Sequence, residues 1–174
     1  EGDHTGLLHS SINQISQKNN NSLWICTNMG VAIYNLHTEK IEAFDHLQNV
    51  HINTVLEDAE GTVWFGTQIG LFSYHPESDS IKQYSADKNP GSLSNNNVRV
   101  LYLDSRNNMW IGTDNGLNLY DAHKDIFFKY LSNQGSNPIS PGSVTSLVED
   151  YAGRLWVGVG GSGGGGGLNL LLNY

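Results

Sequence analysis

Three aspartates recur at one distance from a tryptophan, and paired carboxylates are the first groups to consider for chemistry. Asp58, Asp104 and Asp150 each precede a tryptophan by six residues. Two carboxylates facing one substrate could hydrolyse a glycosidic bond by acid–base catalysis. Each aspartate, however, opens a short turn, as in the Asp-Ala-Glu-Gly sequence that starts at Asp58, where an Asp side chain binds its own backbone. The pattern therefore favours a structural role, and we expect no catalytic residue.

Histidine and cysteine side chains could bind a metal ion or act as nucleophiles. The seven histidines are His4, His9, His37, His46, His51, His75 and His123. None forms an H-x-H or H-E-x-x-H spacing, so the sequence predicts no metal site. The single cysteine, Cys26, excludes an internal disulfide and a cysteine-based zinc site. We expect a small buried thiol there, and neither a metal nor another cofactor in the protein.

A glycine-rich run occupies residues 160–167. Glycine-rich loops cradle phosphates where a Lys-Ser/Thr pair follows and a helix begins. Neither feature follows this run. We therefore expect a flexible insertion or linker at this point.

The tryptophans reveal an internal repeat. This repeat determines the strands and turns on which the aspartates, histidines, cysteine and glycines lie. Trp24, Trp64, Trp110 and Trp156 are 40, 46 and 46 residues apart. The aliphatic residues twelve positions before them are Ile12, Ile52, Val98 and Val144, and those nine positions before them are Ile15, Val55, Leu101 and Leu147. Tryptophans could stack on sugar rings, but their place in a repeating strand column favours packing between repeats.

Each repeat indicates four short strands joined by turns rich in Gly, Asp and Asn. Units of this size are typical of propeller blades, so the fold class is all-β: a β-propeller built from four four-stranded antiparallel repeats, the last incomplete. We expect one partial propeller domain over residues 1–174. Its blade repeats span residues 11–46, 51–86, 97–132 and 143–174, and the last repeat lacks a fourth strand.

Loops on one rim of such a propeller are the candidate binding surface. The turns between second and third strands share a face with the connections between blades. The residues predicted to line this rim are Asn28, Gln68, Asp114, Asn115, His51, Asn95, Asn96, Asn97 and Ser143. Amide and hydroxyl groups of this kind suit the hydroxyls of neutral sugars, and a hydrated loop surface is the alternative.

Charge and hydropathy restrict the partners. The 174 residues carry a net charge of −8, which repels nucleic acid and anionic membranes. No apolar run approaches the roughly 20 residues that span a bilayer. The segment from Glu1 to His4 lacks the basic start of a signal peptide. A cytoplasmic protein and a piece of a longer chain are both consistent with this.

The repeat resembles the two-component regulator propeller repeat. The second unit carries the motif residues Asp58, Gly61, Trp64, Gly66, Thr67, Gly70, Leu71 and Tyr74, and the third carries Asp104, Trp110, Gly112, Thr113, Gly116, Leu117 and Tyr120. The first unit departs, with Lys18 for the aspartate and Cys26 for the glycine. The resemblance implies a periplasmic sensor region of a Bacteroides-type hybrid histidine kinase, which recognises an oligosaccharide through part of a seven-bladed propeller.

Four repeats leave the two terminal blades without neighbours, and this bears on partners and function. An open arc exposes strand edges and apolar faces, so we expect remaining blades or another copy of the chain to cover them. We expect a non-enzymatic ligand sensor. A propeller glycosidase or lyase and a protein-docking scaffold are the alternatives, because propellers perform all three roles.

Overall fold

The computed structural model describes residues 7, 11–133, 138–161 and 165–171. These form three four-stranded sheets and one three-stranded sheet, each antiparallel with its strands in sequence order. Blade 1 contains β1 (Ile12–Asn19), β2 (Ser22–Thr27), β3 (Gly30–Asn35) and β4 (Ile41–Ala43). Blade 2 follows a 3-10 turn (Asp45–Leu47) and contains β5 (Ile52–Glu57), β6 (Val63–Thr67), β7 (Gly70–His75) and β8 (Ser80–Tyr84).

The third and fourth sheets complete the series. Blade 3 contains β9 (Val98–Leu103), β10 (Met109–Thr113), β11 (Gly116–Asp121) and β12 (Ile126–Tyr130). Blade 4 contains β13 (Ser143–Glu149), β14 (Leu155–Gly160) and β15 (Gly167–Leu171). The predicted fold class, all-β propeller blades with an incomplete last repeat, is confirmed. No helix in the described ranges is long and apolar enough to cross a membrane.

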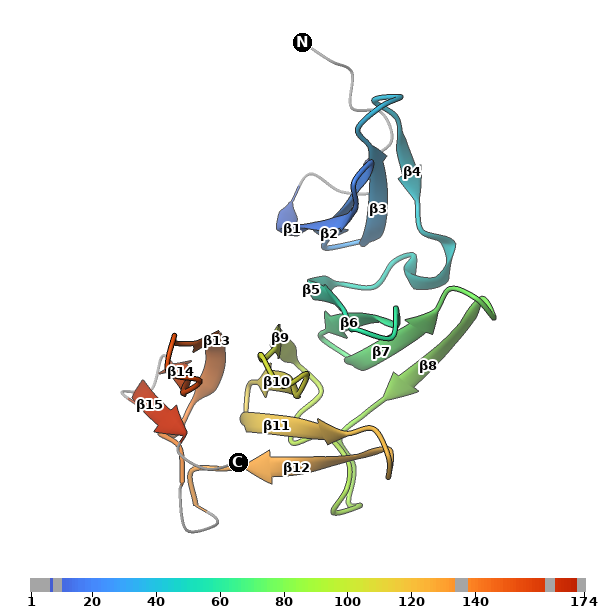
Figure 1. Ribbon diagram of the computed structural model, residues 1–174. Helices are drawn as coiled ribbons and strands as arrows, with labels where there is room; N and C mark the ends of the chain where they lie inside the picture. The colour runs from blue at the N-terminus through green and yellow to red at the C-terminus, as the bar shows by residue number, and fades with distance from the viewer. Residues whose placement is uncertain (1–6, 8–10, 134–137, 162–164, 172–174) are drawn as a thin grey trace.

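The four sheets follow one another around an open arc, with the first strand of each blade on the inner side (Figure 1). The first strands of successive blades contact one another, β1 with β5, β5 with β9 and β9 with β13. Blades 1 and 4 lie at the two ends of the arc (Figure 1). The first strands therefore bring equivalent residues of all four repeats together on the inner side of the arc.

The hydrophobic core lies between the sheets, as the tryptophan columns predicted. At the junction of blades 2 and 3, Trp64 and Leu71 pack with Val98 and Leu101 of the next first strand. The other two junctions repeat this arrangement around Trp24 and Trp110. Each blade thus stabilises its neighbour by burying apolar surface that a single sheet would expose.

The threonine and glycine of the repeat motif build the tight turn between second and third strands. Thr67 Oγ1 donates to the Gly70 carbonyl at 2.7 Å and accepts from the Ile69 amide at 3.0 Å. Gly70 has φ +129°, and a Cβ there would lie 2.3 Å from the Tyr84 carbonyl oxygen. Only glycine both adopts this positive φ without strain and leaves room for the carbonyl oxygen. The same bonds recur at Thr27 and Thr113, so every complete blade presents this turn in the same way.

The glycine-rich segment joins β14 to β15, the connection that corresponds to these turns in the other blades. Residues 162–164 within it lie outside the described residues. Gly166 and Gly167 have φ of +134° and +150°. Blade 4 therefore carries an enlarged connection on the side of the molecule where blades 1 to 3 carry a tight turn.

Candidate binding rim

The first strand of every blade contains a β-bulge at the same position. The pairing of each first strand with its second strand shifts by one residue, which leaves an extra residue on the first strand. The four extra residues are Asn13, Asn53, Arg99 and Thr145. A bulge redirects the side chain of its extra residue. These four residues are not among those predicted from the sequence, although each directly follows an aliphatic residue of the repeat column.

Two bulge asparagines join neighbouring blades through identical bonds. Asn13 Nδ2 donates to the Ile52 carbonyl at 2.7 Å, and Asn53 Nδ2 donates to the Val98 carbonyl at 2.6 Å. Asn13 Nδ2 also lies 3.0 Å from Asn28 Oδ1. These asparagines therefore fix the inner strands to one another and connect them to the rim turns.

Asp114 is the centre of a polar cluster between blades 3 and 4. Arg99 Nε and Nη2 donate to its two oxygens at 2.6 and 3.2 Å, which gives a fork-like ion pair. Asn97 Nδ2 donates at 2.7 Å and Ser143 Oγ at 2.9 Å. Burial alone would raise the pKa of Asp114, but these three donors outweigh it and hold the pKa below its ordinary value. The carboxylate is therefore ionised and fully engaged near neutral pH.

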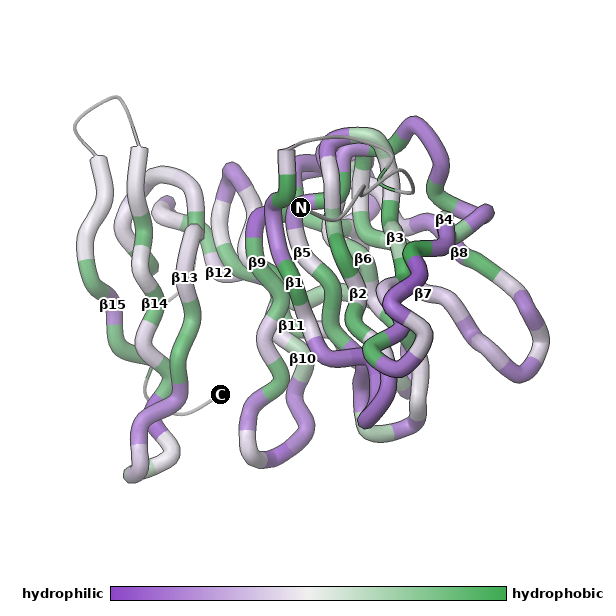
Figure 2. Tube along the Cα trace, turned by 90° about the horizontal axis from the view of Figure 1, so that it is seen from above, coloured by the Kyte–Doolittle hydropathy of each residue, from purple (hydrophilic) through white to green (hydrophobic). Residues whose placement is uncertain are grey.

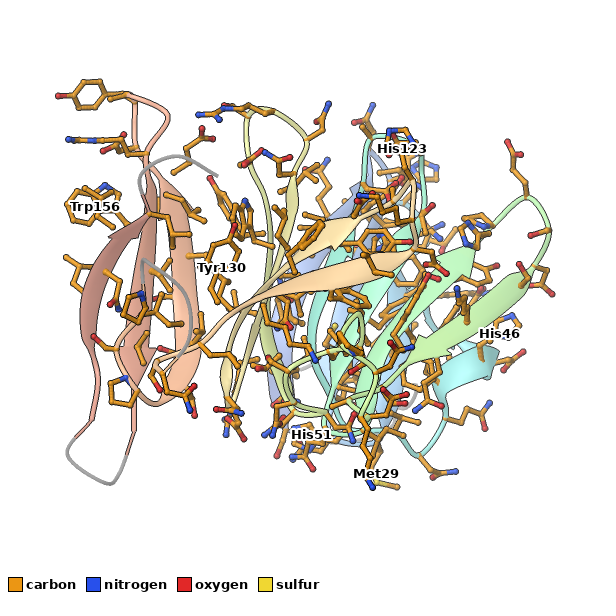
Figure 3. The ribbon with its side chains drawn as sticks, turned by 90° about the horizontal axis from the view of Figure 1, so that it is seen from below. Met29, His46, His51, His123, Tyr130 and Trp156 are labelled. Carbon is orange, nitrogen blue, oxygen red and sulfur yellow. The ribbon has the colours of Figure 1, made fainter. Side chains whose placement is uncertain are left out.

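A second group of predicted residues surrounds a hollow between blades 1 and 2. The hollow has a volume of about 370 Å³ and is lined by Asn28, Asn49, Val50, His51, Gln68 and Ile69. Figure 3 shows Met29 and His51 at one end of the molecule, with His123 at the opposite end. The polar side chains at this end thus come from the β2–β3 turn, the β6–β7 turn and the connection between blades 1 and 2. These are the kinds of loop that were predicted to share one rim.

The remaining predicted residues differ in what they offer a ligand. Asn95 Oδ1 accepts from the Asn97 amide at 2.8 Å, and Asn96 Oδ1 accepts from the Ala86 amide at 2.7 Å, so both support their own loop. Gln68 and Asn115 are exposed, and their side chains make no hydrogen bond within the described part of the chain. Among the predicted rim residues, these two amides are the ones whose donor and acceptor are both unused by other described residues.

Two asparagines on the third strands, Asn118 (buried) and Asn169 (half-buried), hold the long connections in place. Asn118 Oδ1 accepts from the Ser94 amide at 2.9 Å, while Asn118 Nδ2 donates to the Ile111 carbonyl at 3.1 Å. Asn169 Oδ1 accepts from the Ser140 amide at 2.8 Å in the next blade. The Leu-Asn-Leu sequence that the two strands share is the signal from which this role could have been predicted. The connections that carry Asn97 and Ser143 are therefore fixed in place.

The motif aspartates are occupied by structural bonds. Asp104 Oδ2 accepts from Trp110 Nε1 at 3.0 Å, and its Oδ1 accepts from the backbone amides of Arg106 and Asn108. Equivalent bonds link Asp58 to Trp64 and Asp150 to Trp156. The predicted turn-capping role is confirmed by these contacts, which also satisfy the indole nitrogens.

The histidines and the cysteine occupy separate places. His46 Nε2 lies 2.7 Å from Asp79 Oδ1, and His75 Nδ1 lies 3.3 Å from Thr62 Oγ1. No group of three or more His, Cys, Asp or Glu side chains among the described residues could hold a metal ion. Cys26 is buried, and burial raises its pKa to about 12, so the thiolate that a nucleophile requires is scarce at neutral pH.

Comparison with known proteins shows what the repeats are similar to. A family model described as two component regulator propeller matches residues 46–68, 92–115 and 138–161. Each matched segment covers a connection between blades, a first strand and a second strand. Among curated proteins, histidine kinase P4 of Formosa agariphila is 35% identical over 87 residues, which are 47% of this chain and 6% of the kinase.

Two solved structures share the architecture. The extracellular domain of a putative one component system from B. thetaiotaomicron is 25% identical, with a TM-score of 0.74 over 94% of this chain and 22% of that domain. The extracellular domain of a putative hybrid two component system from the same organism is 22% identical, with a TM-score of 0.62 over 97% of this chain and 27% of that domain. This chain thus spans less than a third of either structure.

Proposed function

Since this chain carries two-component regulator propeller repeats, we propose that it is part of the extracytoplasmic sensor region of a hybrid two-component regulator. The likeness to extracellular domains supports the location outside the cytoplasm. The small share of those domains that the chain spans supports its being four blades of a larger, seven-bladed propeller. In such a protein the sensor binds a ligand, and the kinase activity resides in another part of the polypeptide.

The ligand that we propose is a neutral oligosaccharide bound at the rim. Gln68 and Asn115 offer free amide groups, and each amide both donates and accepts, which matches the hydroxyls of a sugar. Asp114 is the one acidic side chain among the nine predicted rim residues, and Arg99 neutralises it. A neutral ligand that covered an unpaired charge would desolvate it without offering a partner. A rim without net charge avoids this cost.

The ionised and hydrogen-bonded carboxylate of Asp114 is the observation that best supports binding without catalysis at the rim. A hydrolase needs two carboxylates across the scissile bond, one of which must hold a proton. Asp114 makes four hydrogen bonds and is held ionised, so it has neither a proton to give nor a free oxygen for attack. Signalling would instead require that the ligand favour one of two arrangements of the sensor.

A protein-docking role is the second candidate, and one observation favours it. Met29 and Ile69 lie at the tips of two rim turns and are 39% and 51% exposed. Apolar side chains at adjacent turn tips can contact a protein partner more readily than a sugar hydroxyl. In that case Ile69→Ser would weaken capture of the partner and leave sugar titrations silent.

Isothermal titration with a panel of plant and host oligosaccharides tests the proposal. We expect saturable heat with intact sugar, and at least tenfold weaker binding in the double variant Gln68→Ala/Asn115→Ala. His123→Ala at the opposite end is the matched control and should bind as the parent does (Figure 3). Continuous heat with shortened sugar products would instead establish a hydrolase, and silence over the whole panel would reject the oligosaccharide.

A further inference from the structure

Three loops line the hollow between blades 1 and 2, and backbone hydrogen bonds join them to one another. The backbone amide of Asn49, in the connection between the blades, donates to the Met29 carbonyl of the β2–β3 turn at 2.9 Å. The backbone amide of Gln68, in the β6–β7 turn, donates to the His51 carbonyl of the same connection at 3.4 Å. These bonds hold the walls in place before a ligand arrives, so binding need not order them.

The amide side chains of the lining retain unused hydrogen-bonding groups. Asn28 Oδ1 accepts from Asn13 Nδ2 at 3.0 Å, but Asn28 Nδ2 donates to no other described residue. The side-chain amides of Asn49 and Gln68 make no hydrogen bond within the described ranges. An amide donates and accepts, as a sugar hydroxyl does. The hollow thus offers three amides to a neutral sugar.

His51 adds a hydrogen-bond donor to the lining. Its Nε2 lies 3.3 Å from Asn13 Nδ2. Asn13 Nδ2 also donates to the Ile52 carbonyl, and an amide nitrogen has no acceptor capacity, so His51 Nε2 is the acceptor in this contact. The proton of the neutral imidazole is therefore on Nδ1. No described residue accepts a hydrogen bond from Nδ1, which leaves it available to a sugar hydroxyl.

The equivalent groups between blades 2 and 3 are satisfied by one another. Asn97 there occupies the position of His51. Asp114 occupies that of Gln68, and its backbone amide donates to the Asn97 carbonyl at 3.1 Å. The side chains are joined as well, because Asn97 Nδ2 donates to Asp114 Oδ2 at 2.7 Å and Asn97 Oδ1 accepts from Asn53 Nδ2 at 3.1 Å. The polar groups between blades 1 and 2 are therefore the ones free to bind a ligand.

Apolar side chains complete the lining. Val50 is half-buried there, and Ile69 is 51% exposed. Figure 2 shows hydrophobic positions mainly along the strands and hydrophilic positions mainly in the turns and connections, so an exposed isoleucine at a turn is unusual on this molecule. Gln83 Nε2 donates to the Ile69 carbonyl at 2.9 Å and holds the turn in place. A sugar ring has a face of C–H groups that can cover such a side chain.

We propose that this hollow is the principal sugar subsite of the rim. Its volume of about 370 Å³ lies near the lower end of the range of small-molecule sites, about 300–1,000 Å³, so it takes a segment of about one or two sugar residues. Asn115 is not part of the lining. It therefore contacts only the part of a longer sugar that extends beyond the hollow. This inference rests on the proposed function and adds where on the rim recognition takes place.

Isothermal titration with the sugar panel, extended to the disaccharide unit of each member, tests this assignment. We expect the disaccharide of a recognised sugar to bind nearly as tightly as the longer sugar. Asn49→Gly, Gln68→Ala and His51→Phe should each weaken disaccharide binding about tenfold, the loss expected for one or two hydrogen bonds. Glycine is used at Asn49 because φ there is +62°, which glycine adopts without strain. Asn115→Ala is the matched control and should leave disaccharide binding unchanged.

The same titrations separate failure of this inference from failure of the proposed function. If the parent binds sugar and Asn49→Gly and Gln68→Ala bind it equally well, the rim binds sugar at another place and the inference is wrong. A parent that binds long sugars but none of the disaccharides would overturn it too. Silence of the parent with every sugar rejects the proposed function, and the inference with it. Thermal denaturation shows that each variant is folded as the parent is.

Discussion

At the scale of single residues, the recurring aspartate and tryptophan form one unit. The carboxylate caps its own turn and accepts from the indole nitrogen, so the tryptophan can be buried at a blade junction without an unsatisfied donor. Blade 1 shows the consequence of a departure from this pattern. Lys18 replaces the aspartate, its ammonium lies 4.1 Å from the Trp24 ring centroid, and the buried Trp24 Nε1 has no hydrogen-bond partner among the described residues.

Asp104→Ala should lower the free energy of unfolding by about 2–3 kcal/mol, because it leaves the buried Trp110 Nε1 and two backbone amides without their acceptor. Asp150→Ala should cost less, since Trp156 is partly exposed and water can replace the lost carboxylate. Urea denaturation of the two variants measures the difference. Equal losses at both positions would show that the bond to the indole is not the source of the stability.

At the scale of elements, glycines on the second strands set how closely the blades approach. A Cβ on Gly112 would lie 2.6 Å from Val100 Cγ1 and 2.7 Å from Val144 Cγ1, one in its own blade and one in the next. Gly66 is equally confined. Blade 1 has Cys26 at this position and buries its side chain completely. The column therefore fixes the junctions between blades 2, 3 and 4, and blade 1 accepts a small side chain.

Gly112→Ala should destabilise the protein by about 1–3 kcal/mol, because first strands from two blades must move to admit one methyl group. Gly160→Ala is the matched control, since the nearest atom to a Cβ there is Thr145 Oγ1 at 4.0 Å. Thermal denaturation of both variants gives the comparison. A Gly112→Ala protein as stable as the control would mean that the blades adjust freely.

At the scale of the whole molecule, repetition explains which features the sequence could predict. The apolar columns and turn glycines recur with the same residue types, so strand order, blade junctions and the incomplete fourth blade follow from spacing. The bulge position is occupied by Asn13, Asn53, Arg99 and Thr145, of which only the first two share a residue type. Whether such a residue bonds to the next blade or, like Arg99, to its own blade depends on side-chain direction, which spacing does not determine.

Acid should destabilise the whole arc through its engaged carboxylates. Hydrogen bonds outweigh burial and hold the pKa values of Asp104 and Asp114 below their ordinary range, while the bond from Trp156 lowers that of Asp150 to about 2. The unfolded value is about 3.9, so the stabilisation is complete above that pH and is lost as the pH falls through the folded values.

Urea denaturation between pH 6 and pH 2.5 checks this dependence. We expect these groups to leave the free energy of unfolding unchanged down to about pH 5 and to lower it progressively below that pH. Asp114→Asn removes one of the groups and should reduce the slope of the loss. A free energy of unfolding that stays constant down to pH 2.5 would contradict the role given to these carboxylates.

The central claim is that the rim binds an intact oligosaccharide without cleaving it, and mapping of backbone amide chemical shifts during addition of the sugar panel tests it most directly. We expect shifts around Asn28, Gln68, Asn97 and Asn115, with the sugar recovered at its original length. Shifts confined to the opposite end around His123, shortened sugar products, or no shifts with any sugar of the panel would contradict it.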